Sequence, residues 1–187
     1  DYNIMRSISF DITVDTVLPD LTIDTIPVTN NSTPSLTGTY ADTNGISSIT
    51  ISIDGEPEEA VILDDGDWSY TVSSSLSAGT HSVVVTATDN AGNVTSTTSN
   101  IIIDLTNPNV TFTPVPYTNN STPTLTGSYS DVNGVASVVV LVDGGAAQAA
   151  TLNAGTWSYT TTTLTAGTHT VVVTATDNAG NVTSTTS

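Results

Sequence analysis

Residues 87–99 read ATDNAGNVTSTTS, and the same sequence returns at residues 175–187, an offset of 88 positions. Upstream, the offset is 89, and the corresponding residues are Asp15 and Asp104, Asp42 and Asp131, Gly55 and Gly144, and Trp68 and Trp157. One residue is therefore missing from the second copy, opposite Ser73–Ser75. An identical internal segment at this spacing is typical of tandem structural units. The 187 residues are thus divided into two domains of roughly 90 residues each.

Each copy contains short segments in which apolar and polar residues alternate, separated by clusters of Gly, Asn, Asp and Pro. This pattern is typical of strands and turns in an all-β sandwich. In the first copy we expect strands near residues 20–26, 35–41, 46–53, 58–63, 68–73, 80–88 and 93–103. Seven strands per copy predict an all-β fold of two tandem, seven-stranded, immunoglobulin-like β-sandwiches, end to end.

Turns and core residues recur in register. Asp54-Gly55 and its copy Asp143-Gly144 are typical of hairpin turns, where glycine accepts a positive φ. Trp68 and Trp157 each precede a tyrosine by two positions, which places large rings on one strand face. We expect both tryptophans to anchor the two cores rather than to stack on a ligand.

The domain boundaries follow from the two offsets. Residues 1–14 align with 90–103, so they are expected to be a last-strand segment of a preceding or neighbouring unit. Residues 15–103 form the first repeat, and residues 104–187 form the second, whose last strand is incomplete. The junction Ile103-Asp104-Leu105-Thr106-Asn107-Pro108 contains no Gly/Ser linker, so we expect a stiff connection.

Charge excludes several classes of partner. The chain has one basic residue, Arg6, against eighteen acidic ones, a formal net charge of −17. Nucleic acids and anionic membranes both require a basic surface, so neither is an expected partner. No run of about 18 apolar residues exists, and membrane insertion is not expected. The chain also has no cysteine, so disulfides cannot stabilise the two small cores. A bound metal is the remaining candidate for that stabilisation.

The junction segments and the two ATDNAGN motifs resemble the bacterial immunoglobulin-like repeats of large secreted adhesins. The motif residues are Ala87–Asn93 and Ala175–Asn181, and the junction residues are Val14–Pro19 and Ile103–Pro108. The resemblance covers essentially the whole chain. It implies an extracellular stalk module at the bacterial cell surface, whose partners are neighbouring repeats, with any surface or glycan ligand elsewhere in the parent protein. It also implies calcium at the domain junctions.

Three acidic positions per repeat are expected to meet at one end of each sandwich, because the linker, the loop after the second strand and the last turn all emerge there. Calcium prefers six to eight oxygen ligands, which carboxylates, carbonyls and water supply together. We therefore predict one structural Ca²⁺ per repeat. The metal ligands are expected to be Asp15, Asp42 and Asp89 in the first repeat, and Asp104, Asp131 and Asp177 in the second.

Further residues have weaker signals. Asn44, Asn90 and their copies Asn133 and Asn178 are further oxygen donors for the cation, although asparagine is equally common in turns. Asp64, Asp65 and Asp67 are not repeated, which favours a solvated loop over another cation site. His81 and His169 recur in one structural position and are expected to be hydrogen-bonded or exposed strand residues.

The leading interpretation is a calcium-rigidified spacer with no enzymatic activity, because no group of nucleophile, base and orienting residue can be assembled. A second interpretation is a subunit of a filament, in which residues 1–14 of one molecule complete the last strand of another by donor-strand exchange. A third is a carbohydrate- or protein-binding module, for which the few aromatic residues offer little support.

Overall fold

A computed structural model describes residues 11–187 of the chain, which divide into two compact units. Within that range there are sixteen strands and no helix, arranged as four sheets of four strands. The prediction of an all-β chain with two immunoglobulin-like sandwiches is confirmed. Among the described residues, no helix has the length and apolar character needed to cross a membrane.

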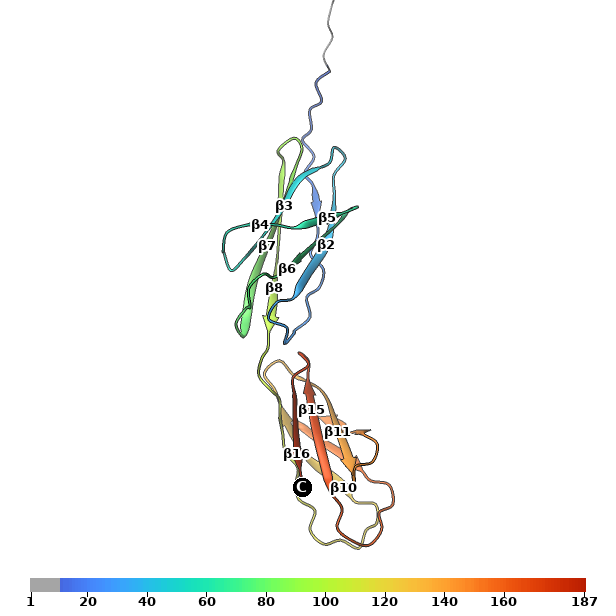
Figure 1. Ribbon diagram of the computed structural model, residues 1–187. Helices are drawn as coiled ribbons and strands as arrows, with labels where there is room; N and C mark the ends of the chain where they lie inside the picture. Colours follow the sequence, from blue (N-terminus) through green and yellow to red (C-terminus); the bar gives the residue numbers. More distant parts are fainter. Residues whose placement is uncertain (1–10) are drawn as a thin grey trace, which may run out of the picture. The chain divides into compact units, whose positions relative to one another are not determined.

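The first sandwich consists of two antiparallel sheets with strand orders β1-β2-β6-β5 and β4-β3-β7-β8 (Figure 1). Its strands are β1 (Asp20–Leu21), β2 (Ser35–Ala41), β3 (Ile46–Ile53), β4 (Glu59–Ala60), β5 (Ile62–Asp64), β6 (Asp67–Thr71), β7 (Gly79–Asp89) and β8 (Val94–Ile103). In β7, every second side chain from His81 to Asp89 is buried, as the alternation in the sequence predicts.

The second sandwich has the same topology, with sheet orders β13-β14-β10-β9 and β12-β11-β15-β16. Its strands are β9 (Asn109–Val110), β10 (Thr124–Ser130), β11 (Val135–Val142), β12 (Gln148–Ala149), β13 (Thr151–Asn153), β14 (Thr156–Thr160), β15 (Val171–Asp177) and β16 (Val182–Thr186). The two last strands β15 and β16 are shorter than their counterparts β7 and β8.

The tryptophans anchor the cores, as predicted. Trp68 and Trp157 are each 1 % exposed. Each indole Nε1 donates a hydrogen bond to a main-chain carbonyl, that of Thr22 at 2.8 Å and that of Thr111 at 2.9 Å. A glycine lies against each ring, because a Cβ at Gly38 or Gly127 would come within 2.6 Å of the indole Nε1 of Trp68 or Trp157. The ring is therefore in contact with the residue that follows the first strand and with the glycine of the second strand.

The strand count differs from the prediction of seven per sandwich. The predicted strand at 58–63 is two strands, β4 and β5, which belong to different sheets and are separated by Val61. The expected first strand at 20–26 is reduced to β1, although Thr22 and Asp24 still donate main-chain bonds to β2. Local alternation indicates an extended segment but cannot indicate where that segment changes sheet.

The hairpin turns follow the sequence prediction more closely. Asp54 and Gly55 have φ values of 54° and 76°, and Asp143 and Gly144 have 52° and 70°. Two successive positive φ angles are the signature of the type I′ turn, which suits the twist of adjacent strands. Both Asp-Gly pairs therefore act as hairpin turns.

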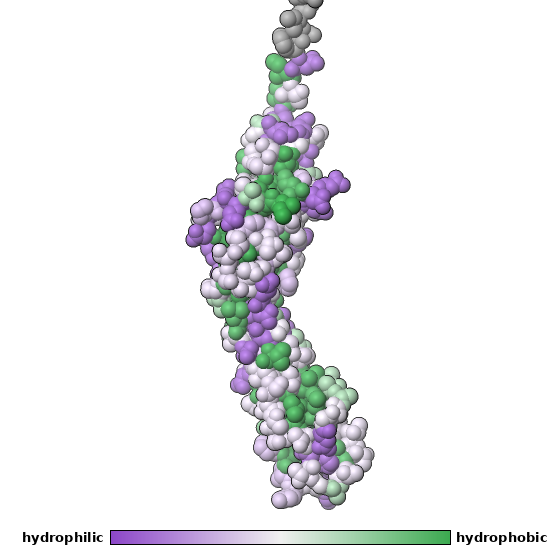
Figure 2. All heavy atoms as spheres, viewed as in Figure 1, coloured by the Kyte–Doolittle hydropathy of each residue, from purple (hydrophilic) through white to green (hydrophobic). Residues whose placement is uncertain are grey.

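Residues 1–10 lie outside the described residues, and the predicted last-strand segment 1–14 falls largely there. Residues 11–14 are not assigned to a strand, and Ile12 and Val14 are 88 % and 80 % exposed. On the face of the molecule drawn in Figure 2, apolar side chains form separate small patches rather than one continuous surface.

The second core contains a buried hydroxyl at a position where the first core has a valine. Thr161 is 5 % exposed, and among the described residues its Oγ1 has no hydrogen-bond partner. It lines a cavity of about 240 Å³ together with Val140, Val142, Tyr159 and Leu164. The corresponding residue of the first sandwich is Val72, which is 5 % exposed.

We expect Thr161→Val to stabilise the second sandwich by about 1 kcal/mol, because it removes an unsatisfied buried hydroxyl at nearly constant volume. The reciprocal Val72→Thr is the matched control and should destabilise the first sandwich by about 1–3 kcal/mol. Denaturant unfolding of each variant measures both changes. Equal and small effects of the two substitutions would contradict this account of the core.

His169 and Asp143 form an ion pair in the second sandwich. His169 Nδ1 lies 2.6 Å from Asp143 Oδ2, and His169 Nε2 lies 2.8 Å from the Thr165 carbonyl oxygen. The hydrogen bond with Asp143 raises the pKa of His169, and the same bond lowers the pKa of Asp143. The prediction that the histidines are hydrogen-bonded is confirmed for His169 and for His81, which contacts the Ser77 carbonyl oxygen at 2.9 Å.

This pair predicts a pH dependence of stability. Folding raises the pKa of His169, so the histidine stabilises the folded state. This stabilisation is complete below the ordinary histidine pKa of 6.5 and is lost as pH rises through the raised pKa. The contribution of Asp143 is lost as pH falls through its lowered pKa. We expect His169→Gln to flatten the decline in unfolding free energy between about pH 6 and pH 8. An unchanged pH profile in this variant would contradict the assignment.

Candidate metal centre

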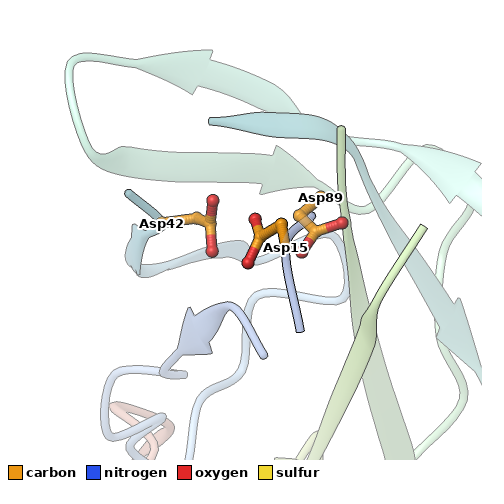
Figure 3. Close-up of side chains that lie close together, drawn as sticks. All are labelled: Asp15, Asp42 and Asp89. Atoms are coloured by element: carbon orange, nitrogen blue, oxygen red, sulfur yellow. The ribbon is translucent and has the colours of Figure 1, made fainter. Parts of the chain in front are cut away.

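Three carboxylates of the first sandwich lie together, although they are far apart in the sequence. Asp15 precedes β1, Asp42 follows β2, and Asp89 is the last residue of β7. One carboxylate oxygen from each lies within 4.8 Å of the others. Figure 3 shows Asp15 between Asp42 and Asp89, with the three carboxylates grouped.

The second sandwich repeats this arrangement. Asp104 follows β8 directly, Asp131 follows β10, and Asp177 ends β15. One oxygen from each again lies within 4.8 Å of the other two. All six residues that the sequence predicts as metal ligands therefore fall into the two expected groups of three.

Short turns orient these carboxylates. Asp42 Oδ1 accepts the main-chain amide of Asn44 at 2.8 Å, and Asp131 Oδ1 accepts that of Asn133 at 2.8 Å. Asp15 Oδ1 accepts the amide of Val17 at 3.0 Å. In each case the carboxylate caps a turn two residues later, which is the usual reason for Asp in such loops.

Asp89 and Asp177 are the most enclosed members, at 1 % and 2 % exposure. Asp89 Oδ1 accepts the amides of Ala91 and Asn93, both at 2.8 Å. Burial alone would raise the pKa of Asp89, but bonds from the Asn93 side chain and from the turn amides lower it below its ordinary value. The carboxylate is therefore charged at neutral pH, as a cation ligand must be.

The geometry and the donor set fit a hard cation. Two oxygens on one calcium ion lie at most about 5 Å apart, since each Ca–O distance is about 2.3–2.6 Å. The separations within 4.8 Å satisfy that limit. Among the described residues, Asp42 Oδ2 is buried without a hydrogen-bond partner, which leaves one oxygen of the first cluster unsatisfied.

The asparagines play a different part from the one expected. Asn90 Nδ2 donates to the Asn44 carbonyl at 2.7 Å, and Asn178 Nδ2 donates to the Asn133 carbonyl at 2.7 Å, so both tie two loops together. Asn44 and Asn133 instead reach the clusters through their amide nitrogens, which donate to Asp15 at 2.8 Å and to Asp104 at 3.0 Å.

The sequence reasoning did not single out Asn93 and Asn181 as site residues. Asn93 Nδ2 donates to Asp89 Oδ2 at 2.7 Å and to the Asp15 carbonyl at 3.2 Å. Asn181 makes the same pair of bonds with Asp177 and Asp104, both at 2.9 Å. Their recurrence at the end of both ATDNAGN motifs is the signal that was available.

Among residues 11–187, the other acidic and aromatic residues do not assemble into a site. Asp64 and Asp65 are exposed in the β5–β6 hairpin, and they belong to neither carboxylate group. A groove of about 500 Å³ crosses the β13-β14-β10-β9 sheet and is lined mainly by Thr and Ser, but its Trp157 is buried rather than presented as a platform.

Two antiparallel sheets with this strand order define an immunoglobulin-like structural domain, a non-enzymatic class of fold. The family model described as "Bacterial Ig-like domain" matches residues 22–105 and again residues 116–187. The chain therefore belongs to the bacterial immunoglobulin-like domain family, with two tandem copies.

Comparisons with solved structures agree on the fold. The fibronectin(III)-like modules of Clostridium thermocellum CbhA are 17% identical, with a TM-score of 0.51, and the match covers 89% of this chain and 91% of theirs. A bacterial ice-binding adhesin is 22% identical, also with a TM-score of 0.51, and the match covers 94% of this chain and 64% of that structure. Among curated proteins, none matches the chain.

Proposed function

We propose that this chain is a calcium-rigidified spacer segment of a bacterial surface adhesin, and that its work is mechanical rather than enzymatic. The observation that carries the proposal is the in-register pair of carboxylate clusters, each of which includes the residue that leads into its domain. Family membership and the adhesin neighbour support the setting. The absence of a basic surface agrees with a chain that projects from the cell rather than binding polyanions.

The mechanism follows from electrostatics. Three carboxylates at these separations repel one another by about 1 kcal/mol per pair in water, and by more where water is partly excluded. A divalent cation between them replaces this repulsion with attraction, and it binds all three loops at once. Because Ile103 ends β8 and Asp104 is the next residue, a cation on Asp104 would restrain the peptide that leaves the first sandwich.

Calcium titration calorimetry tests the metal. We expect two sites per chain in the wild type, one site in Asp131→Asn, and none in the double variant Asp42→Asn/Asp131→Asn. Magnesium is the comparison ion, because it demands a smaller octahedral shell and keeps its water. Absence of calcium binding at millimolar concentrations would reject the metal site.

Distance measurements test the mechanical role. The chain has no cysteine, so spin labels can be attached to cysteines introduced at the exposed positions Glu59 and Gln148, one in each sandwich. Calcium should narrow the distribution of distances, and Asp104→Asn should abolish that narrowing. A distribution that is equally broad with calcium and with chelator would remove the rigidity from the proposal while leaving the metal site intact.

A second candidate function, a subunit of a donor-strand filament, is favoured by one observation. Ile12 and Val14 are 88 % and 80 % exposed, whereas the residues that align with them, Ile101 and Ile103, are 0 % and 2 % exposed at the end of β8. A strand carrying Ile12 and Val14 would therefore suit a place beside β15 of another copy.

Cysteine cross-linking tests that candidate. The β15–β16 register pairs Val172 with Thr186, and its continuation would set Thr13 of one copy opposite Thr168 of another. Directly opposed residues are close enough for a disulfide. A ladder of disulfide-linked oligomers in a chain carrying both Thr13→Cys and Thr168→Cys supports the filament, and exclusively monomeric chains would reject it.

A further inference from the structure

We infer that Asn93 and Asn181 are positioning residues that hold the linker aspartate of each cluster in place before a cation arrives. The inference rests on the proposed calcium site and adds a clasp that works without metal. The clasp of each repeat is the side-chain amide of this asparagine, together with its two acceptors. In the first repeat those acceptors are Asp89 Oδ2 and the Asp15 carbonyl oxygen, and in the second they are Asp177 Oδ2 and the Asp104 carbonyl oxygen.

The orientation of each amide is determined by its neighbours. A carboxylate oxygen and a main-chain carbonyl oxygen are both acceptors, so only the NH₂ end of the asparagine can face them. For Asn181 the two bonds are both 2.9 Å, and its main-chain amide adds a third bond, to Asp177 Oδ1 at 2.8 Å. Each NH₂ group therefore uses both of its hydrogens inside the cluster.

The clasp joins two distant parts of the chain. The bond from Asn181 to the Asp104 carbonyl spans 77 positions of sequence, and the bond from Asn93 to the Asp15 carbonyl spans 78. A second tie from the neighbouring loop reaches the same linker residue, from Asn133 to Asp104 at 3.0 Å. The linker backbone and its carboxylate are thus each held by a neutral donor.

Neutral donors suit this task because they offset part of the repulsion among the carboxylates without competing for the ligand positions. Each carboxylate oxygen has more than one lone pair, so an oxygen that accepts an amide hydrogen can still bind a cation. The cation then binds ligands that are already assembled. Partners of this kind commonly change metal affinity by about 10–100-fold when they are removed.

The test compares Asn181→Ala, Asn181→Asp and the control Val182→Asp in the full chain. Asn181→Ala should weaken calcium binding at the second site by about 10–100-fold. Asn181→Asp should lower the thermal midpoint in chelator, because a carboxylate would face Asp177 and the Asp104 carbonyl, and calcium should restore it. Val182→Asp adds the same charge at the next residue, whose side chain is 50 % exposed and takes no part in the clasp, and its calcium affinity should change by less than about threefold.

Hydrogen exchange in chelator separates this inference from the calcium site itself. The amide of Thr106 donates to Asp104 Oδ1 at 2.9 Å, so its exchange reports on the linker. We expect Asn181→Ala to speed that exchange at least about tenfold without calcium, while amides of β11 and β15 remain protected. Unchanged exchange at Thr106 in both Asn181 variants would overturn the clasp even if calcium binds. Faster exchange would support the clasp even if calcium does not bind.

Discussion

Chelating calcium is expected to lower the stability of each sandwich by about 2.7 kcal/mol, relative to a solution in which calcium is present at about 100 times its dissociation constant. For domains of this size, a loss of that order corresponds to a fall in the thermal midpoint of about 10–20 °C. The physical reason is that the unfolded chain keeps the three aspartates of a cluster apart and therefore binds the ion poorly. The folded chain brings one oxygen of each within 4.8 Å of the others.

Thermal unfolding with calcium and with chelator measures this effect. The double variant Asp42→Asn/Asp131→Asn should melt at nearly the same temperature in both conditions, because it lacks one of the three carboxylates of each cluster. Added monovalent salt should raise the midpoint of the wild type in chelator, since it screens the remaining repulsion. Identical wild-type midpoints with and without calcium would contradict the proposed stabilisation.

Replacing Asp177 with alanine is expected to destabilise the second sandwich by about 2–4 kcal/mol even in chelator. Asp177 is 2 % exposed, and its carboxylate accepts the amides of Ala179 and Asn181 at 2.9 and 2.8 Å. Removing the acceptor leaves these partly buried donors without a partner, and each such loss costs about 1–3 kcal/mol. In calcium, the loss of the ion adds to this cost.

Asp131→Ala is the matched control for that experiment. Asp131 belongs to the same cluster, but its main-chain bond is one local turn contact with Asn133 at 2.8 Å. In chelator this variant should therefore lose less than about 1 kcal/mol, whereas in calcium it should lose the ion as Asp177→Ala does. If both variants lost the same unfolding free energy in chelator, the two amide bonds accepted by Asp177 would not explain its effect.

Much of the candidate site was accessible from the sequence, because its elements are local. The Asp in the loop after the second strand and the Asp within the ATDNAGN motif each accept the main-chain amide two residues later, and such turns depend only on neighbouring residues. Recurrence in two copies then separated the six cluster residues from Asp64 and Asp65, which are not repeated. The topology of the sandwich supplied the common end at which they meet.

The direction of the asparagine hydrogen bonds was not accessible in the same way. Asparagine carries a donor and an acceptor at nearly equal distances from its backbone, so the sequence cannot decide which end faces a neighbour. The carbonyl of Asp15 and the carboxylate of Asp89 decide it for Asn93, and they lie on different elements. Asn90 belongs to the same motif as Asn93, yet its amide bonds to the loop carbonyl of Asn44 instead.

By itself, the sequence determined the all-β class, the two repeats, the buried tryptophans and the six aspartates, because alternation, turn residues and repetition are properties of neighbouring positions. Only the tertiary structure decided that each sandwich has eight strands, that the buried hydroxyl of Thr161 lacks a partner among the described residues, and that amide nitrogens rather than carbonyl oxygens face the carboxylates. The physical reason is that changes of sheet, burial and donor direction depend on groups brought together from distant parts of the chain.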